Sequence, residues 1–362
     1  MRSVCFVERI ELEFVGNVLE KALCLGDVDN DGENELVVGG VSGDLFVYKG
    51  DKLWQSMTGL GPVTGVAVGD LMNCGSNALV VVSGDGWCHI YLCLDSAQHA
   101  NGAKLELVHN QRIPANTKVV VLGDVQGDGQ VDMVLGLTDR VVRIYKWLQS
   151  PSAANLVCLN KCESANQVGS VCLGKSAGSI PCILVSQPGA TYMTITHREE
   201  GNMQVDYHAV SGNKVSSTNI SAKMVSNIGK KEAHALVTID GCIMLIHNQQ
   251  LLWTLNVEND QLFAADKANV TESEGEELVI CSWSGNTYII DEDSNAVCFQ
   301  LGEPVQAFTS GLYTSDSTTS FVYVTFNNKV IMSDFTPNIS DILSVSSIKM
   351  YFCFMLFISS PF

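Results

Sequence analysis

The sequence predicts an all-β protein built as one seven-bladed β-propeller. A Gly-Asp or similar start, a polar loop and a short apolar run recur seven times, as in GDVDNDGENELVV from Gly26. Each unit indicates strand, turn and strand, with Gly or Asn at most turns. A four-stranded blade buries its faces only against its neighbours, so such units require a ring. No apolar period of 3.6 residues is sustained over three turns, which argues against helical repeats.

The seven units begin 36 to 55 residues apart, a spacing typical of propeller blades. Their starts are Gly26, Gly69, Gly123, Gly174, Gly229, Ala265 and Gly311. We expect the first strand of each blade to end beside these starts, near Leu25, Val68, Leu122, Leu173, Ile228, Ala264 and Ser310. A propeller adds blades around one axis, so the 362-residue chain is expected to form one domain over residues 1–335.

The loop of the first unit carries the pattern of a calcium site. Carboxylates stand at positions 1, 3, 5 and 9 of the loop, as Asp27, Asp29, Asp31 and Glu35. Gly32 permits the sharp turn at position 6, and the carbonyl of Glu33 stands at position 7. An EF-hand is a poor alternative, because its flanking helices are missing and Val38 replaces the closing glutamate. A merely solvated acidic hairpin loop stays open as the second interpretation.

The other loops are weaker or empty candidates. The third copy departs from the pattern at one position, with Asp124, Gln126, Asp128 and Asp132 in the side-chain places and Gln130 at position 7. The second copy has Met72, Cys74 and Ala78 where ligands belong, and the last four loops have no ligand set. We therefore expect Ca²⁺ as a structural cofactor, bound better by the first loop than by the third because attraction grows with ligand charge. It would clamp two strands of one blade.

The repeats resemble the FG-GAP repeats of the integrin α propeller, whose loop pattern is D-x-D-x-D-G-x-x-[DE]. The residues of the first loop that match this pattern are Asp27, Asp29, Asp31, Gly32 and Glu35. Over its whole length the chain is similar to an intracellular family of FG-GAP proteins that belongs to the KICSTOR scaffold complex. The resemblance implies kaptin, a second propeller protein, and the other KICSTOR subunits as partners. It also implies a role in tethering the GATOR complex at the cytosolic face of the lysosome. Such a protein would restrain TOR kinase signalling when amino acids or glucose are scarce.

Composition favours a soluble cytoplasmic protein. Hydrophobic residues make up 46% of the chain, which is ample for a core, and the net charge is −18. The 21 basic residues do not cluster, so nucleic acid and anionic lipid are disfavoured as ligands. The 13 cysteines fall mostly in apolar strands, as at Cys88 and Cys281, and their odd number suits free thiols in a reducing cytosol. Cys158 and Cys162 lack the second pair that a zinc site needs.

The N-terminal segment alternates apolar and charged residues, which predicts a half-buried strand over residues 4–15. We expect it to be the outer strand of the last blade, closing the ring; an independent strand on the first blade is the alternative. Its charges, including Glu8 and Arg9, leave no apolar core for a signal peptide. The glycosylation sequons at Asn219, Asn269 and Asn338 are then expected to stay unmodified.

Residues 336–362 stop repeating and end in KMYFCFMLFISSPF, whose apolar core is shorter than the roughly 20 residues of a spanning helix. One interpretation is a strand packed on the propeller. We favour the other, a disordered tail from an alternative transcript end, because folded surfaces avoid exposed aromatic runs.

No catalytic constellation is recognisable. The seven histidines are spread over separate repeats, without an HExxH, G-x-S-x-G or phosphate-loop pattern. The missing motifs argue against an enzyme, and the resemblance implies a non-catalytic scaffold subunit. An extracellular, integrin-like calcium-dependent adhesion module is the alternative, and a hydrolase is the third class. No residue in the sequence identifies the partner-binding face.

Overall fold

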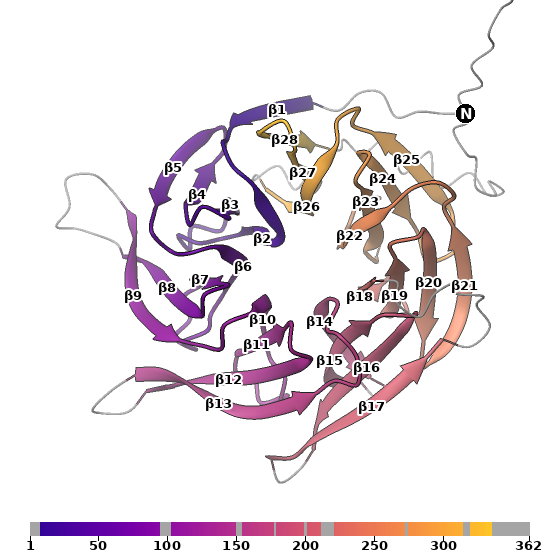
Figure 1. Cartoon of the computed structure of the whole chain (residues 1–362), viewed down its shortest axis with the longest axis horizontal. Coiled ribbons are helices and arrows are strands. Elements are labelled where there is room, and N and C mark those ends of the chain that lie inside the picture. Colours follow the sequence, from indigo (N-terminus) through magenta and orange to yellow (C-terminus); the bar gives the residue numbers. More distant parts are fainter. Residues whose placement is uncertain are drawn as a thin grey trace, which may run out of the picture.

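The structure, a computed structural model, describes residues 8–94, 103–149, 154–176, 179–198, 201–210, 221–271, 274–313 and 319–334. These residues form 28 β-strands and no α-helix. The strands make seven four-stranded antiparallel sheets arranged around one axis (Figure 1). The predicted seven-bladed propeller is thereby confirmed. The predicted tail, residues 336–362, and the sequons at Asn219 and Asn338 lie outside the described residues.

Each blade runs from an inner strand at the axis to an outer strand at the rim (Figure 1). Blades 1 and 2 contain β2 (Val18–Gly26), β3 (Glu35–Gly40), β4 (Leu45–Lys49), β5 (Lys52–Met57), β6 (Val63–Gly69), β7 (Ala78–Ser83), β8 (Trp87–Leu94) and β9 (Lys104–Arg112). Blades 3 and 4 contain β10 (Thr117–Gly123), β11 (Asp132–Leu137), β12 (Val141–Gln149), β13 (Ala154–Glu163), β14 (Val171–Ser176), β15 (Ile180–Gln187), β16 (Thr191–His197) and β17 (Met203–Ala209). Blades 5 and 6 contain β18 (Ala222–Ile228), β19 (Ala233–Thr238), β20 (Cys242–His247), β21 (Gln250–Asn256), β22 (Leu262–Ala268), β23 (Glu277–Ser282), β24 (Asn286–Ile290) and β25 (Ala296–Gln300). Blade 7 combines β26 (Val305–Leu312), β27 (Thr319–Thr325) and β28 (Lys329–Asp334) with β1 (Glu8–Glu13).

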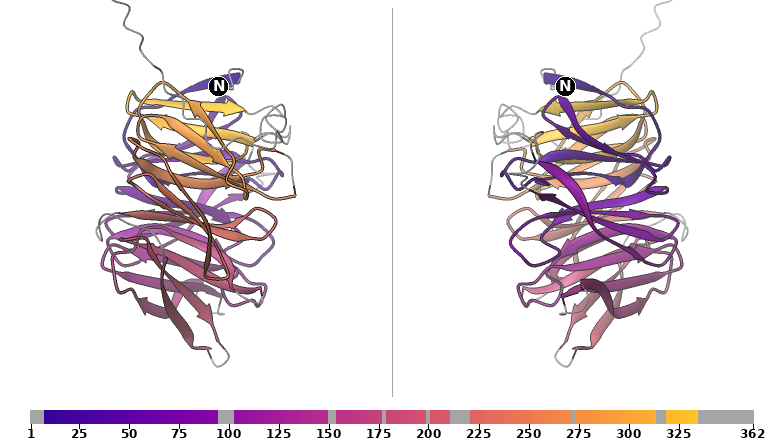
Figure 2. Two further views of the ribbon diagram at one scale, coloured as in Figure 1. Left: turned by 90° about the vertical axis from the view of Figure 1, so that its right-hand side faces the viewer. Right: turned by 90° about the vertical axis from the view of Figure 1, so that its left-hand side faces the viewer.

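The core lies between the blades. The second strand of a blade packs on both faces, and in β3, β7, β11, β23 and β27 every residue is buried. This burial explains the continuous apolar runs that follow each polar loop in the sequence. Outer strands such as β5 and β9 are largely exposed. Seen from the side, the blades pack into a thick disc whose loops emerge on two opposite faces (Figure 2).

The glycine that begins several repeats is required by the approach of neighbouring inner strands. A Cβ at Gly26 would lie 2.6 Å from Cβ of Val68, and one at Gly123 would lie 2.3 Å from Cδ1 of Leu173. Both contacts are closer than real Cβ atoms approach other atoms. The repeated glycine thus allows the inner strands to converge on the axis.

The first strand of the chain joins the last blade. β1 pairs antiparallel with β28, in register from Glu8 opposite Asp334 to Glu13 opposite Lys329. Leu12 and Phe14 are buried in the core between blades 7, 1 and 2. The ladder covers the outer edge of β28, which would otherwise present unpaired backbone groups.

The expected position of the sixth repeat needs correction. Its inner strand β22 continues to Ala268, four residues beyond the expected end at Ala264. The loop closes with Glu277, whose Oε2 accepts the Val270 N–H at 2.8 Å. The same contact joins Glu35 and Val28 in blade 1 at 2.9 Å. The Ala-Asp at residues 265–266 therefore resembles a repeat start but belongs to the strand.

Candidate functional site

The loops that join the first and second strands of blades 1, 2 and 3 share one backbone shape. Their first residue is an aspartate whose carboxylate accepts the backbone N–H groups of positions 5 and 6 of the loop, and in blade 3 also that of Gly127 at 2.6 Å. The pairs are Asp31 and Gly32 to Asp27, Cys74 and Gly75 to Asp70, and Asp128 and Gly129 to Asp124, at 2.7 to 3.3 Å. The position 6 glycines have φ of 77° to 92°, which favours glycine. The first aspartate therefore holds the turn even in blade 2, which lacks the ligand pattern.

The first loop brings three of its predicted carboxylates together. Oxygen atoms of Asp27, Asp29 and Glu35 lie within 4.8 Å of one another. Glu35 is fully buried, and burial raises the pKa of its carboxyl to about 7. Glu33 donates its N–H to Oδ1 of Asp31 at 2.9 Å.

A lysine that the sequence interpretation missed lies among these carboxylates. Nζ of Lys49 is 2.6 Å from Oδ2 of Asp29, 2.5 Å from Oδ2 of Asp31 and 3.5 Å from Oε1 of Glu35. Burial opposes the ammonium charge, but the hydrogen bonds to Asp29 and Asp31 outweigh it and raise the pKa of Lys49. Lys49 ends β4, directly across the sheet from Glu35, as the register of Leu36 opposite Tyr48 requires. This pairing between strands was the signal that could have found it.

The third loop repeats the arrangement with fewer contacts. Nζ of Lys146, on β12, is 2.6 Å from Oδ2 of Asp128 and lowers the pKa of that carboxyl. Asp132 is fully buried, and burial raises its pKa. Nε2 of Gln126 lies 3.4 Å from both of its oxygens. Gln126 therefore approaches a carboxylate as a donor, and Gln130 contributes its N–H to Asp128 at 3.0 Å.

Neighbouring loops are tied to one another by asparagine side chains. Asn30 accepts the Asn77 N–H at 2.6 Å, which joins blades 1 and 2. Asn73, at the same place in the second loop, accepts the Val131 N–H at 2.7 Å, which joins blades 2 and 3. The third loop has Gly127 at this place, so the series of contacts ends there. The loops therefore act between blades as well as within them.

The carboxylates of the first loop suit a hard cation in type, and an ammonium group contacts three of them. Ca²⁺ is held by six to eight oxygens at 2.3 to 2.6 Å. Asp29, Asp31 and Glu35 already contact an ammonium group. Calcium at either predicted loop stays a prediction.

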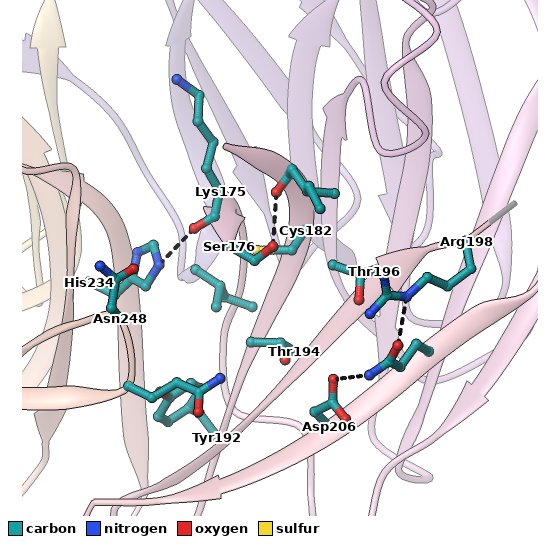
Figure 3. Close-up of a pocket in the computed structure, with 14 residues that line it drawn as sticks. Lys175, Ser176, Cys182, Tyr192, Thr194, Thr196, Arg198, Asp206, His234 and Asn248 are labelled. Carbon is teal, nitrogen blue, oxygen red and sulfur yellow. Dashed lines mark hydrogen bonds between the residues drawn. The ribbon is translucent and has the colours of Figure 1, made fainter. Parts of the chain in front are cut away.

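A polar cavity of about 390 Å³ lies between blades 4 and 5 (Figure 3). One wall carries Arg198, whose Nε donates to Gln204 at 2.6 Å, and Gln204 donates in turn to Asp206 at 2.8 Å. On the opposite wall, Nε2 of His234 lies 3.2 Å from the carbonyl oxygen of Lys175. Cys182 also lines the cavity, but burial raises the pKa of its thiol to about 11. A thiol that stays protonated is a poor nucleophile.

The face opposite the acidic loops carries a group of exposed apolar side chains on blades 6, 7 and 1. Trp283, Phe326 and Val41 each follow the second strand of their blade, and Val15 lies in the link from β1 to β2. Successive strands of a blade are antiparallel, so all four emerge on one face of the disc. We call these four residues the apolar turn patch.

Hydrogen bonds place the turns of blades 6 and 7 and the β1–β2 link beside one another. Phe326 donates its N–H to Pro304 at 3.1 Å, and the next residue, Val305, donates to the carbonyl of Trp283 at 3.1 Å. The Gly16 N–H contacts Oδ1 of Asn328 at 3.4 Å, which places the Val15 link beside the turn of blade 7. Phe326 is 56% exposed and Val15 81% exposed. Exposed apolar groups that gather in this way mark interaction surfaces.

Comparison with known proteins identifies the family. The family model described as integrin-alpha FG-GAP repeat-containing protein 2 matches residues 47–203 and 194–333. The chain belongs to this family. A relative from Mus musculus named "KICSTOR complex protein ITFG2" is 38% identical over 91% of this chain and 84% of its own length. A Bos taurus relative of the same name is 39% identical over 91% of this chain and 70% of its own length.

Solved structures share the fold of this family member at low sequence identity. BBS1N, crystallised in complex with ARL6DN, matches with a TM-score of 0.70 and 13% identity, over 93% of this chain and 99% of its own. Raptor of Chaetomium thermophilum matches with a TM-score of 0.61 and 13% identity, over 91% of this chain and 30% of its own. Identities this low establish the propeller architecture alone. Within the described residues, no helix has the length and apolar character to cross a membrane.

Proposed function

We propose that this chain is a non-catalytic scaffold subunit of a KICSTOR complex. The observation that carries the proposal is its similarity, over 91% of its length, to relatives named as KICSTOR complex proteins. A propeller suits such a role because its faces and edges offer several separate binding surfaces on a rigid ring.

The chemistry of the described cavity supports a binding role. A nucleophilic thiol needs a lowered pKa, and Cys182 has a raised one. The polar side chains there are engaged with one another, as in the contacts from Arg198 through Gln204 to Asp206. They resemble the satisfied wall of a groove more than an activated reaction centre.

The finer part of the proposal concerns the partners. It names kaptin and the other KICSTOR subunits as direct or indirect partners, and the GATOR complex as the cargo tethered at the cytosolic face of the lysosome. The consequence would be restraint of TOR kinase signalling when amino acids or glucose are scarce. These assignments rest on the family resemblance.

The apolar turn patch is the surface that we assign to a partner subunit. Large aromatic side chains often carry most of the energy of an interface, and Trp283 and Phe326 are exposed neighbours on one face. Its rim is charged: Arg9 contacts Glu303 at 2.9 Å, and Lys329 lies 3.5 Å from the same carboxylate. An apolar centre with a polar rim is the usual anatomy of a protein interface.

Affinity purification of the tagged chain from cells, followed by mass spectrometry, tests both steps. We expect KICSTOR subunits to co-purify with the wild-type chain, and Trp283→Glu with Phe326→Glu to reduce their yield about tenfold or more per folded molecule. Leu107→Glu and Leu252→Glu, on outer strands away from the patch, serve as matched controls. Loss of partners in the controls as well would reject the assignment of the apolar turn patch as the partner-binding surface. Absence of KICSTOR subunits from the wild-type purification would discard the function.

Partner binding is expected to be nearly independent of calcium. The acidic loops lie on the face opposite the patch, and ligand occupancy stabilises the fold only when the free ion exceeds its Kd. Purification in excess chelator should therefore retain the partners. Their complete loss, with the propeller still folded by circular dichroism, would make an acidic loop part of the interface.

A further inference from the structure

We propose that Lys49 is the resident cation of the first acidic loop, and that Lys146 has the same role in the third. The blade thus supplies, from its own third strand, the positive charge that a metal ion would bring. Calcium gains access to the first loop only when Lys49 is removed.

The geometry around Lys49 carries the inference. Its ammonium group hydrogen-bonds the carboxylates at loop positions 3 and 5 and forms a longer ion pair, at 3.5 Å, with the one at position 9. These are three of the four side-chain ligand places in the predicted calcium pattern. A metal ion and the ammonium would therefore compete for Asp29, Asp31 and Glu35. The remaining carboxylate, Asp27, is held by the N–H groups of Asp31 and Gly32.

A comparison of the first three blades supports the same conclusion independently. The residue that closes the loop faces a residue on the third strand, and the two change together. The pairs are Glu35 with Lys49, Asp132 with Lys146, and Ala78 with Leu92. The preceding third-strand residue is a buried tyrosine in all three blades, so the positions correspond. Among these three blades a lysine is present where the closing residue is a carboxylate, and a leucine where it is alanine. In blade 6 the closing Glu277 faces Asp291 and is held instead by the Val270 N–H and the Thr271 hydroxyl.

Electrostatics explains why the pairs change together. A fully buried carboxylate such as Glu35 is strongly destabilised unless an opposite charge or several donors compensate it. Lys49 is tethered to the same sheet, so its effective concentration at the loop is set by the fold and not by the surrounding solution. The compensation is then present at every calcium level. The apolar pair in blade 2 removes the requirement altogether.

The test measures calcium binding to the purified full chain after chelator treatment, by calorimetry and by thermal melting. We expect the wild-type chain to show no calcium binding at the first loop and no shift in melting temperature with calcium. Lys49→Gln should create a site, with affinity at least about tenfold above wild type and a melting temperature that rises on adding calcium. The control is Lys52→Gln, which should behave as wild type. Lys52 is exposed and is the first residue of β5, in the same hairpin as Lys49.

Two further measurements keep the proposal open to refutation. Asp29→Asn in the Lys49→Gln background should abolish the new calcium binding, which locates it in the loop. If Lys49→Gln does not fold, the wild-type chain decides alone: calcium binding that Asp29→Asn removes would overturn the proposal, and its absence would support it. Lys49→Arg keeps the charge and should remain insensitive to calcium. Equal calcium affinity of the wild-type and Lys49→Gln chains would also overturn the proposal.

Discussion

The loops between the first and second strands of blades 1 and 2 have the same backbone shape but differ in the charge of the side chains at their base. Both are held by a leading aspartate that accepts two N–H groups, and both turn at a glycine with positive φ. In blade 1 the closing position joins a carboxylate to a lysine, whereas in blade 2 the corresponding residues are Ala78 and Leu92. The shape of the loop therefore depends on its first and sixth residues. The closing residue and the third-strand residue opposite it can be either an ion pair or two apolar side chains.

The difference shows that a metal-loop motif has two separable parts. One part makes the turn, and the other sets the charge at its base. A sequence pattern does not separate the turn-making residues from the charged ones. A loop that matches the whole pattern can therefore have a lysine, and not a metal ion, as the counter-charge of its carboxylates. Each of the following experiments breaks or sharpens this comparison.

The largest effect is expected from removing the charge of Lys49 alone. Lys49→Leu leaves buried Glu35 without its cation and should lower the free energy of unfolding by about 2 kcal/mol, a value reduced because the lysine is partly exposed. Adding Glu35→Ala copies the blade 2 pair and should recover part of the loss. Urea unfolding of the two single variants and the double variant measures the coupling. Additive losses would show that Glu35 and Lys49 do not depend on each other.

The next effect concerns the turn in blade 2. Asp70→Ala removes the acceptor of the Cys74 and Gly75 N–H groups and should cost about 1.5 kcal/mol. Because this loop lacks the ligand pattern, the loss should be equal in calcium and in chelator. Thermal melting in both buffers checks this, with Asp240→Ala, a turn aspartate of blade 5, as a comparison outside the acidic loops. A loss seen only in calcium would assign Asp70 a metal.

A smaller effect is expected in blade 3. Lys146→Leu should lower the free energy of unfolding by about 1 kcal/mol, less than in blade 1, because Lys146 has one short carboxylate contact and Gln126 lies near Asp132. Urea unfolding beside Lys49→Leu ranks the two sites. A larger loss in blade 3 would reverse the ranking of the loops.

The smallest effect is on reactivity and leaves stability unchanged. Cys74 is exposed in the second loop, whereas Cys88 is buried on β8 and burial raises the pKa of its thiol to about 12. A thiol reagent applied to the folded chain should modify Cys74 quickly and Cys88 only after unfolding. Mass spectrometry of the peptides measures the order. Early modification of Cys88 would indicate that blade 2 opens locally.

Much of the fold could be predicted because each blade must satisfy the same packing constraints, which leave a similar residue pattern in each repeat. A glycine at the end of an inner strand and a buried apolar run after the loop recur for reasons of packing, as at Gly26 and Gly123. The end of the inner strand of blade 6 was predicted four residues early, because Ala265 and Asp266 imitate a repeat start inside a strand. In that case the buried Glu277, which closes the loop, was the better landmark.

The candidate site was only partly predictable. The alternation of carboxylates named Asp27, Asp29 and Glu35, which do converge. Lys49 was missed because it lies 14 residues after Glu35 in sequence and reaches the loop only through the register of β3 and β4. The apolar turn patch could not be found from sequence either. Its members come from three blades, and their exposure depends on which side of the ring each turn emerges.

The pairing of β1 with β28 has a consequence for the order of events during synthesis. About 320 residues separate the two strands, so β1 leaves the ribosome long before its partner exists. At roughly 5 to 20 residues per second the wait is on the order of half a minute. Throughout that time the closing ladder cannot form, and such long-range pairing slows folding. Thus β28, the last strand of the described residues, is the one whose synthesis allows the ring to close.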